Sequence, residues 1–386
     1  MTNFREARNF VKRLGGLYSI GFSNLVAVFI TGVFFLAIAN LLGIEDYGRI
    51  SYLIAVGIVA SSLAFFGAKD HLMIFTAKEG KSQSTVYLFT IITGIIASII
   101  LFFIFYNVSL SLFVVAWIIF GLVTGELLGR SLYKEYMKIL ITQRILLVGL
   151  GIGLYYLLGT NGIVLGYAFS LLPFSFKIIS VFKKTKIDFS IIKSRSVFIT
   201  HVYGYDLSKT ITTFVDKLII FPLFGYALLG NYQLGAQIVL LMSILPISVY
   251  QFTLPKDTQG KNTNRIKIAT FFISIIFTTL TIFLTPSVIP ILFPDFTEAV
   301  QIIQIMSLSI IPISANYMFS SKFLANEKSR IVFISAVVNI VIQLLGIWIL
   351  GELYGINGAS VALVIAATAQ TLCFLVAIQI CKGKSN

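Results

Sequence analysis

The chain has 386 residues, of which 58% are hydrophobic and 11% are charged, and its mean hydropathy is +0.96. A soluble domain would be about a quarter charged, so this composition argues against a soluble protein. The formal net charge of +14 would suit a nucleic-acid-binding protein, but the basic residues are spread between apolar runs. That distribution is typical of a membrane protein facing anionic lipid, and no nucleic-acid partner is expected.

Apolar runs of about 20 residues recur along the chain, and each is long enough to cross a hydrocarbon core of about 30 Å as a helix. The first six predicted spans are 14–40, 47–68, 84–106, 112–132, 140–158 and 162–181. A basic segment, 182–195, precedes six more, at 197–222, 231–254, 268–284, 299–320, 331–350 and 358–380. The predicted fold class is therefore an all-α polytopic membrane protein with about twelve transmembrane helices.

The lysines and arginines predict the orientation of these spans. If the N-terminus is cytoplasmic, all but three of the 29 basic residues fall in inner segments or at inner helix ends, the exceptions being Arg49, Lys209 and Lys217. Acidic residues such as Glu45 and Asp295 fall on the outer side. Because basic residues are retained in the cytoplasm, we expect a multi-pass protein of the cytoplasmic membrane with both termini inside.

The two halves of the sequence repeat two short motifs. Leu42-Gly43 with Gly48 recurs as Phe224-Gly225 with Gly230, at an offset of 182, and Gly-Thr-Asn-Gly at 159–162 recurs as Gly-Ile-Asn-Gly at 355–358, at an offset of 196. The matches predict two pseudo-symmetric six-helix bundles. The N-terminal lobe is 1–195, including the basic inter-lobe loop, and the C-terminal lobe is 196–386. A parallel repeat of this kind encloses a cavity between its halves, which is transporter geometry.

The chain lacks the motifs of an enzyme. Gly80-Lys81-Ser82 resembles the end of a phosphate-binding loop, but Phe75 stands where the first glycine is needed. Outer loops are too short for a catalytic site, and no His/Cys/Asp cluster has metal-ligand spacing. We expect no catalytic residues, no metal and no cofactor. Of the two histidines, His71 is expected to be exposed at an inner helix end.

Polar residues concentrate in the seventh predicted span. On a helix, one face collects His201, Tyr205, Ser208, Lys209, Thr212 and Asp216, and Asp206, Thr213 and Lys217 extend it. Ionisable residues within a span are costly, so this face is predicted to line a substrate cavity. Lys209 is the candidate to hold a pyrophosphate, and Asp206 or Asp216 to bind a coupling cation or proton.

Two structural interpretations of this span remain open. Asp206 and Lys209, at i and i+3, would neutralise each other as an internal pair. Asp216 and Lys217, near the outer end, would instead reach the interface by snorkelling.

Other polar residues within spans have either a functional or a structural interpretation. In the first span, Ser23 and Asn24 either line the substrate cavity or hydrogen-bond between helices. Arg13 and Arg144 are candidates for an inner gate or for anchors at the membrane surface. Glu126 is expected to pair with Arg130 at i+4. A further group of residues, the prolines inside spans, marks expected bending points: Pro173, Pro246 and Pro312.

Several of these motifs together resemble the oligosaccharide-lipid flippase family of the multidrug/oligosaccharidyl-lipid/polysaccharide exporter superfamily. The similarity rests on Leu42-Gly43-Ile44-Glu45-Asp46-Tyr47-Gly48-Arg49-Ile50, Val215-Asp216-Lys217-Leu218, Leu229-Gly230-Asn231-Tyr232, Phe323-Leu324-Ala325-Asn326-Glu327-Lys328 and Gly355-Ile356-Asn357-Gly358-Ala359. It implies two six-helix lobes, alternating access, and a cavity lined by the first and seventh helices. Lipid II flippases of the same superfamily carry two further spans, which this sequence lacks.

The resemblance implies a function in polysaccharide biosynthesis for the cell envelope. The expected activity is translocation of a polyprenyl- or dolichyl-(pyro)phosphate-linked oligosaccharide across the cytoplasmic membrane. The expected partners are this lipid-linked oligosaccharide, membrane lipids, and a glycan polymerase or glycosyltransferases. One alternative is a cation-coupled, multidrug-type exporter of small molecules with the same fold. Another is a protein without transport activity, such as a membrane scaffold.

Overall fold

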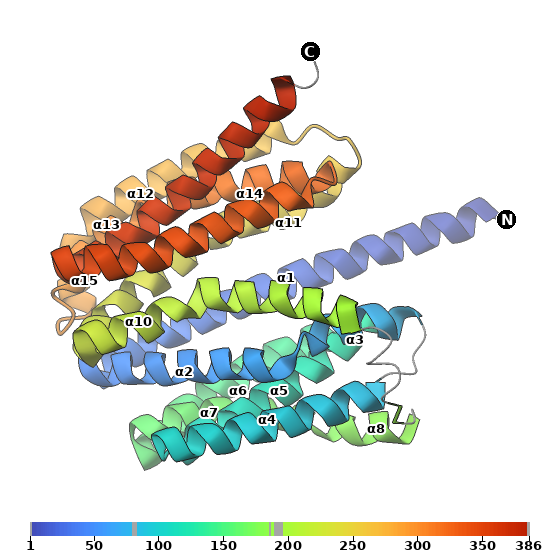
Figure 1. Cartoon of the computed structure of the whole chain (residues 1–386), viewed down its shortest axis with the longest axis horizontal. Helices are drawn as coiled ribbons and strands as arrows, with labels where there is room; N and C mark the ends of the chain where they lie inside the picture. Colours follow the sequence, from blue (N-terminus) through green and yellow to red (C-terminus); the bar gives the residue numbers. More distant parts are fainter. Residues whose placement is uncertain (1, 79–82, 185–186, 189–195, 384–386) are drawn as a thin grey trace. The chain divides into compact units, whose positions relative to one another are not determined.

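The computed structural model describes the backbone of residues 2–78, 83–184, 187–188 and 196–383 (Figure 1). Side chains are described from Gly21 onward, apart from some residues that are named where they matter. All the elements found in these ranges are helices. The predicted all-α class is confirmed for the part of the chain that the structure describes.

The helices follow one another with short connections. The first half contains α1 (Thr2–Leu42), α2 (Ile44–Phe65), α3 (Ala68–Lys78), α4 (Gln83–Phe105), α5 (Val108–Gly129), α6 (Tyr133–Leu158), α7 (Thr160–Leu171), the 3₁₀ helix η1 (Leu172–Phe174) and α8 (Phe176–Lys184). The second half contains α10 (Ser196–Met242), α11 (Ile244–Thr258), α12 (Asn264–Leu292), α13 (Ala299–Ser307), α14 (Ile310–Ala325) and α15 (Ser329–Gly383).

Ten helical stretches of the described residues are long and apolar enough to cross a membrane. The chain is therefore a multi-pass membrane protein. Two of the longest helices, α10 and α15, are each interrupted by a glycine with positive φ, at Gly225 (80°) and Gly355 (62°). Only glycine adopts this left-handed conformation without steric cost, so each glycine separates two helical segments. The predicted spans 197–222 and 231–254 lie on either side of Gly225, and the predicted spans 331–350 and 358–380 lie on either side of Gly355.

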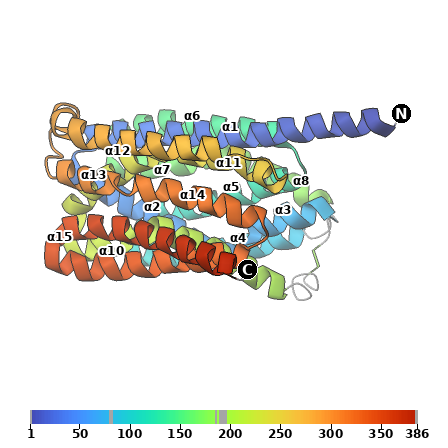
Figure 2. The same cartoon turned by 90° about the horizontal axis from the view of Figure 1, so that it is seen from above.

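Contacts group the helices into two compact units. Unit 1 comprises Met1–Ile30 and Leu53–Val215, and unit 2 comprises Thr31–Tyr52 and Asp216–Asn386. Within unit 2, α14 packs against α11, α12 and α15, and Figure 2 shows these helices from a second side. The predicted lobes, 1–195 and 196–386, describe a sequence duplication and stay a prediction.

Three prolines explain where helices break. Pro246 and Pro312 have no amide hydrogen for the carbonyl four residues earlier, and breaks occur at residue 243, between α10 and α11, and at residues 308–309, between α13 and α14. Pro173 lies in η1, between α7 and α8. A helix is thus interrupted beside each of the three prolines that the sequence marked as bending points. Pro286 and Pro290, by contrast, lie within α12, which continues beyond the span predicted to end at residue 284.

The duplicated glycine motifs adopt matching structures. Gly159 and Gly355 have nearly equal backbone angles, φ 64° with ψ −146° and φ 62° with ψ −149°. At the last glycine of each motif, a Cβ would collide with a backbone carbonyl eight residues earlier: Leu154 for Gly162, and Leu350 for Gly358. The sequence match is thus reproduced as a structural one at the turn that opens each final span.

The other glycine pair forms a helix crossing within unit 2. A Cβ on Gly48 would collide with the Tyr226 carbonyl oxygen and lie 2.9 Å from the Gly230 nitrogen, and a Cβ on Gly230 would collide with the Ile44 carbonyl. The start of α2 and the second segment of α10 therefore touch backbone to backbone, which only glycine permits at both positions. The tyrosine before Gly48, Tyr47, is fully buried against Phe296.

Candidate functional site

The first segment of α10 carries most of the predicted cavity residues. The side chains of His201, Tyr205 and Lys209 lie outside the described residues, as does that of Arg13 on α1. Asp206 is half-buried. Thr212 is also half-buried, and its hydroxyl donates to the Ser208 carbonyl at 2.8 Å. That bond turns Thr212 back onto its own helix.

Asp216 and Lys217 form a buried ion pair. The Lys217 Nζ lies 3.1 Å from Asp216 Oδ1, and the two side chains are only 9% and 7% exposed respectively. The Lys217 backbone N–H also donates to Asp216 Oδ1, at 2.8 Å. Because both groups are buried, snorkelling to the interface does not describe them. Neighbouring helix residues point in different directions, so the pair forms only because the long lysine stem bends round the helix.

Unit 2 contains further buried polar side chains, one of which lies beside this pair. The Tyr232 hydroxyl lies beside Asp216, and the Tyr47 hydroxyl lies beside Gln233. Six buried polar side-chain atoms of unit 2 form no hydrogen bond of good geometry with the part of the chain that the structure describes: Tyr47 Oη, Ser51 Oγ, Asn231 Oδ1, Tyr232 Oη, Gln233 Oε1 and Gln251 Oε1. Buried polar atoms usually find a partner, so this region has the chemistry of a hydrated or ligand-binding site.

A second polar cluster lies within unit 1 and centres on Arg144. The sequence placed this arginine at the start of a span, but α6 begins at Tyr133, so Arg144 lies about 16 Å further along the helix axis. The guanidinium thus lies within α6, and the gate and anchor interpretations of Arg144 stay predictions. Its Nη1 donates to the Tyr167 hydroxyl at 3.0 Å, and no described carboxylate lies within 4 Å.

Helices α1, α6 and α7 hold this cluster together. The Tyr136 hydroxyl on α6 donates to Asn24 Oδ1 on α1 at 3.0 Å. The Gln143 amide donates to the Ser170 hydroxyl on α7 at 2.9 Å. The Arg144 Nε–H is buried and has no acceptor among the described residues. A half-buried guanidinium with unused donors and a polar surround is suited to bind an anion with several oxygens, such as a phosphate.

The remaining predicted residues have structural surroundings. Ser23, next to Asn24, is fully buried. Glu126 accepts from Arg130 Nε at 2.7 Å, as predicted, and also from the Tyr87 hydroxyl at 2.8 Å. With both carboxylate oxygens engaged, Glu126 is suited to joining α4 and α5. Among the described residues, no group of three His, Cys, Asp or Glu side chains could hold a metal ion.

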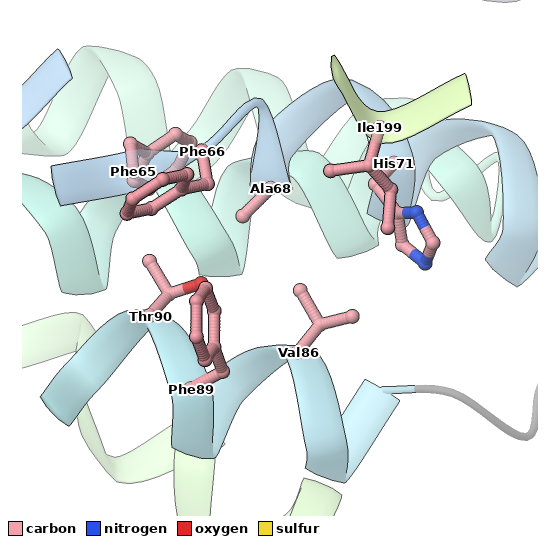
Figure 3. A pocket seen from close by; sticks show the side chains of 8 residues that line it. All are labelled: Phe65, Phe66, Ala68, His71, Val86, Phe89, Thr90 and Ile199. Atoms are coloured by element: carbon pink, nitrogen blue, oxygen red, sulfur yellow. The ribbon is translucent and has the colours of Figure 1, made fainter. Parts of the chain in front are cut away.

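His71 departs from its expected exposure. Its residue is only 2% exposed, and it lines a cavity of about 30 Å³ together with Phe65, Val86 and Thr90 (Figure 3). A volume of that size holds a single water molecule. The sequence places His71 in a polar stretch between two apolar runs. The short helix α3, which turns this residue inward against α4, gave no periodic signal long enough to recognise.

Comparison with known proteins places the fold. No protein-family model matches the sequence, and no curated protein matches it significantly. Solved structures do match: the "Lipid II flippase MurJ, inward closed conformation" has a TM-score of 0.73 and 16% identity, covering 92% of this chain and 87% of that chain. An inward-facing MATE multidrug transporter of the MOP superfamily has a TM-score of 0.70 and 13% identity, covering 97% and 99%. An outward-facing one has a TM-score of 0.58 and 15% identity, covering 96% of both chains.

At these identities the likeness concerns the fold. The chain has the fold of the MurJ flippase and of MATE transporters, which confirms the superfamily fold that the sequence motifs predicted. The neighbours are transporters and flippases. A likeness at 13–16% identity does not establish what this chain binds or moves.

Proposed function

We propose that the chain is a flippase that moves a polyprenyl- or dolichyl-(pyro)phosphate-linked oligosaccharide across the cytoplasmic membrane by alternating access. In this proposal it crosses the membrane twelve times, as two six-helix bundles with both termini in the cytoplasm, and it acts without catalysing a covalent step. Its substrate is made by glycosyltransferases and consumed by a glycan polymerase, which are the proposed partners. The membrane and transporter fold supports the class of activity, and one side chain supports the substrate.

That side chain is Arg144. A charged residue well inside a span is costly unless it is paired or functional, and the described residues supply only the Tyr167 hydroxyl as a partner. The guanidinium presents donors in a planar fork that matches two phosphate oxygens, whereas an organic cation would be repelled. Asn24 and Tyr136 lie on the same cluster and offer hydrogen bonds to a sugar. The side chains thus favour an anionic, hydroxyl-rich substrate.

The Asp216–Lys217 pair bears on the alternative, a cation-coupled exporter of small molecules. Such an exporter needs an embedded carboxylate whose charge is available to a cation. Asp216 is already neutralised by the Lys217 ammonium at 3.1 Å, and a paired carboxylate attracts a cation less strongly. Asp206 remains the candidate carboxylate for this alternative.

The test uses purified protein in vesicles and a fluorescent polyprenyl-diphosphate disaccharide. Arg144→Gln should weaken probe binding by about 10- to 150-fold, the equivalent of one lost charged hydrogen bond of about 1.5–3 kcal/mol, and should slow translocation. Arg144→Lys should recover only part of this, since lysine lacks the planar fork. Lys138→Gln, on the exposed part of the same helix, is the matched control and should change nothing.

Equal binding by Arg144→Gln and Lys138→Gln would refute the proposed substrate site. Lys209→Ala tests the other predicted phosphate ligand in the same assay, and unchanged translocation would remove Lys209 from the site. The exporter alternative predicts proton- or sodium-driven efflux of ethidium that is lost in Asp206→Asn. Such efflux without translocation of the disaccharide probe would replace the flippase proposal.

A further inference from the structure

Unit 2 contains a cavity that the proposed transport function does not use. It has a volume of about 460 Å³ and lies between α12, α14 and α15, where its lining includes Asn264, Lys267, Phe271, Phe319, Lys322 and Leu375. A volume of this size is typical of pockets for small organic ligands. All the lining residues belong to unit 2, so the cavity is complete within that unit.

The lining is divided between a polar end and an apolar end. Asn264 is the first residue of α12, and Lys322 lies in the last turn of α14. Beyond them the cavity is lined by Phe271, Phe319 and Leu375. Leu375 is 43% exposed, so the apolar end continues onto the outer surface of α15, which in a membrane protein faces acyl chains. The occupant should therefore have a polar head and an apolar tail.

A hydrogen-bonded carboxylate fixes the polar end of the cavity. Asp257, at the end of α11, accepts hydrogen bonds from Lys267 Nζ and Thr263 Oγ1, and from Ser321 Oγ at 2.6 Å. These bonds tie the end of α11 to the start of α12 and the end of α14. They also neutralise Lys267, whose side chain is only 10% exposed. The ammonium of Lys322 is exposed at the rim and forms no ion pair with a described carboxylate within 4 Å.

The same end of unit 2 carries further positive charge. Exposed basic residues lie near the ends of these helices: Lys261 in the connection between α11 and α12, Arg265 in the first turn of α12 and Arg330 in the first turn of α15. Basic pockets between transmembrane helices on the cytoplasmic side bind the head groups of anionic lipids. Charge complementarity therefore selects a negatively charged head over a neutral one.

We propose that this cavity is a binding site for an anionic phospholipid. The lipid phosphate lies between the Lys322 ammonium and the Asn264 amide, and one acyl chain enters between Phe271, Phe319 and Leu375. A free phosphate would leave the apolar end empty, and a zwitterionic phospholipid would gain less from Lys322 because its own cationic group offsets the charge of its phosphate. The site holds a membrane lipid alongside α12, and it is independent of the proposed transport substrate.

Brominated lipids provide the test, because bromine quenches a nearby tryptophan. The reporter is the full chain with Phe319→Trp in the cavity and with Trp117→Phe and Trp348→Phe removing the native tryptophans. We expect brominated phosphatidylglycerol to quench the reporter at about fivefold lower concentration than brominated phosphatidylcholine, as expected for one lysine near the membrane surface. Lys322→Gln should abolish this preference. Lys328→Gln, a lysine on the same end but outside the cavity, should retain it.

Two results of the quenching experiment would overturn the proposal. The first is equal quenching by the two lipids in the parent reporter, or the same preference in Lys322→Gln and Lys328→Gln. The second is relief of quenching by inorganic phosphate, which would indicate a free phosphate site. A second measurement avoids dependence on the tryptophan variant: mass spectrometry of protein released from mixed-lipid nanodiscs should find less bound phosphatidylglycerol with Lys322→Gln than with Lys328→Gln. No difference would also overturn the proposal.

Discussion

The crossing of α2 and α10 at Gly48 and Gly230 gives the most direct test of the packing. In Gly48→Ala, the new methyl group would lie 2.9 Å from the Gly230 nitrogen and would collide with the Tyr226 carbonyl. Both obstacles are backbone atoms, so no side-chain rotation can relieve the clash. Overpacking costs about 1–3 kcal/mol, and a clash with backbone atoms lies at the upper end, about 3 kcal/mol. Alanine returns about 1 kcal/mol of helix propensity. We expect a net destabilisation of about 2 kcal/mol.

The assay is thermal unfolding of the purified protein in detergent. For a unit of about 150–250 residues, each kcal/mol shifts the midpoint by about 2–4 °C, so Gly48→Ala should unfold about 4–8 °C lower. Gly149→Ala is the matched control, because Gly149 also lies inside a helix but a Cβ there meets nothing within 4 Å. This control should unfold at the same or a slightly higher temperature. If both variants behave alike, the close crossing does not exist in the folded protein.

Two further predictions follow from buried groups, each measured by the same unfolding assay. Asp216→Asn leaves the Lys217 ammonium buried without its counter-charge and should lower the free energy of unfolding by about 3–5 kcal/mol. The control Glu135→Gln breaks an exposed ion pair and should lower it by at most about 1 kcal/mol. Equal effects would contradict the burial of the Asp216–Lys217 pair. Gly162→Ala and Gly358→Ala should destabilise by similar amounts, about 1–3 kcal/mol each, because each added methyl meets a backbone carbonyl; a large effect at only one position would contradict the structural repeat.

Much of the fold could be predicted because a membrane imposes a strong pattern on sequence. Apolar runs predicted long apolar helices, and the glycine motifs predicted turns that the structure repeats. The motif glycines at positions 159 and 355 have the same backbone conformation, so the short sequence match carried real structural information. What remained hidden was the extent of helices beyond the apolar runs. α6 begins seven residues before the span predicted at residue 140, because charged residues near the membrane surface continue a helix as readily as apolar ones.

The early start of α6 accounts for part of the difference between the predicted and the observed surroundings of the candidate site residues. Arg144 was predicted to be an inner gate or a surface anchor because the apolar run starts near it, and the structure places it within α6 beside Tyr167. Asp216 and Lys217 were predicted to line the cavity or to reach the interface by snorkelling, and the buried ion pair between them was not predicted. The lipid cavity had no sequence signal at all, since Asn264, Lys322 and Leu375 come together only through tertiary packing.

The proline breaks in unit 2 have a mechanical consequence. At Pro246 and Pro312 the ring nitrogen leaves the carbonyls of Met242 and Leu308 without their usual helical donors. A helix such as α5, which has no proline, would have to give up a backbone hydrogen bond in order to bend, in a solvent that offers no replacement. In α11 and α14 the prolines have already removed one such backbone hydrogen bond each. Bending at these two positions therefore costs fewer backbone hydrogen bonds than bending α5 would.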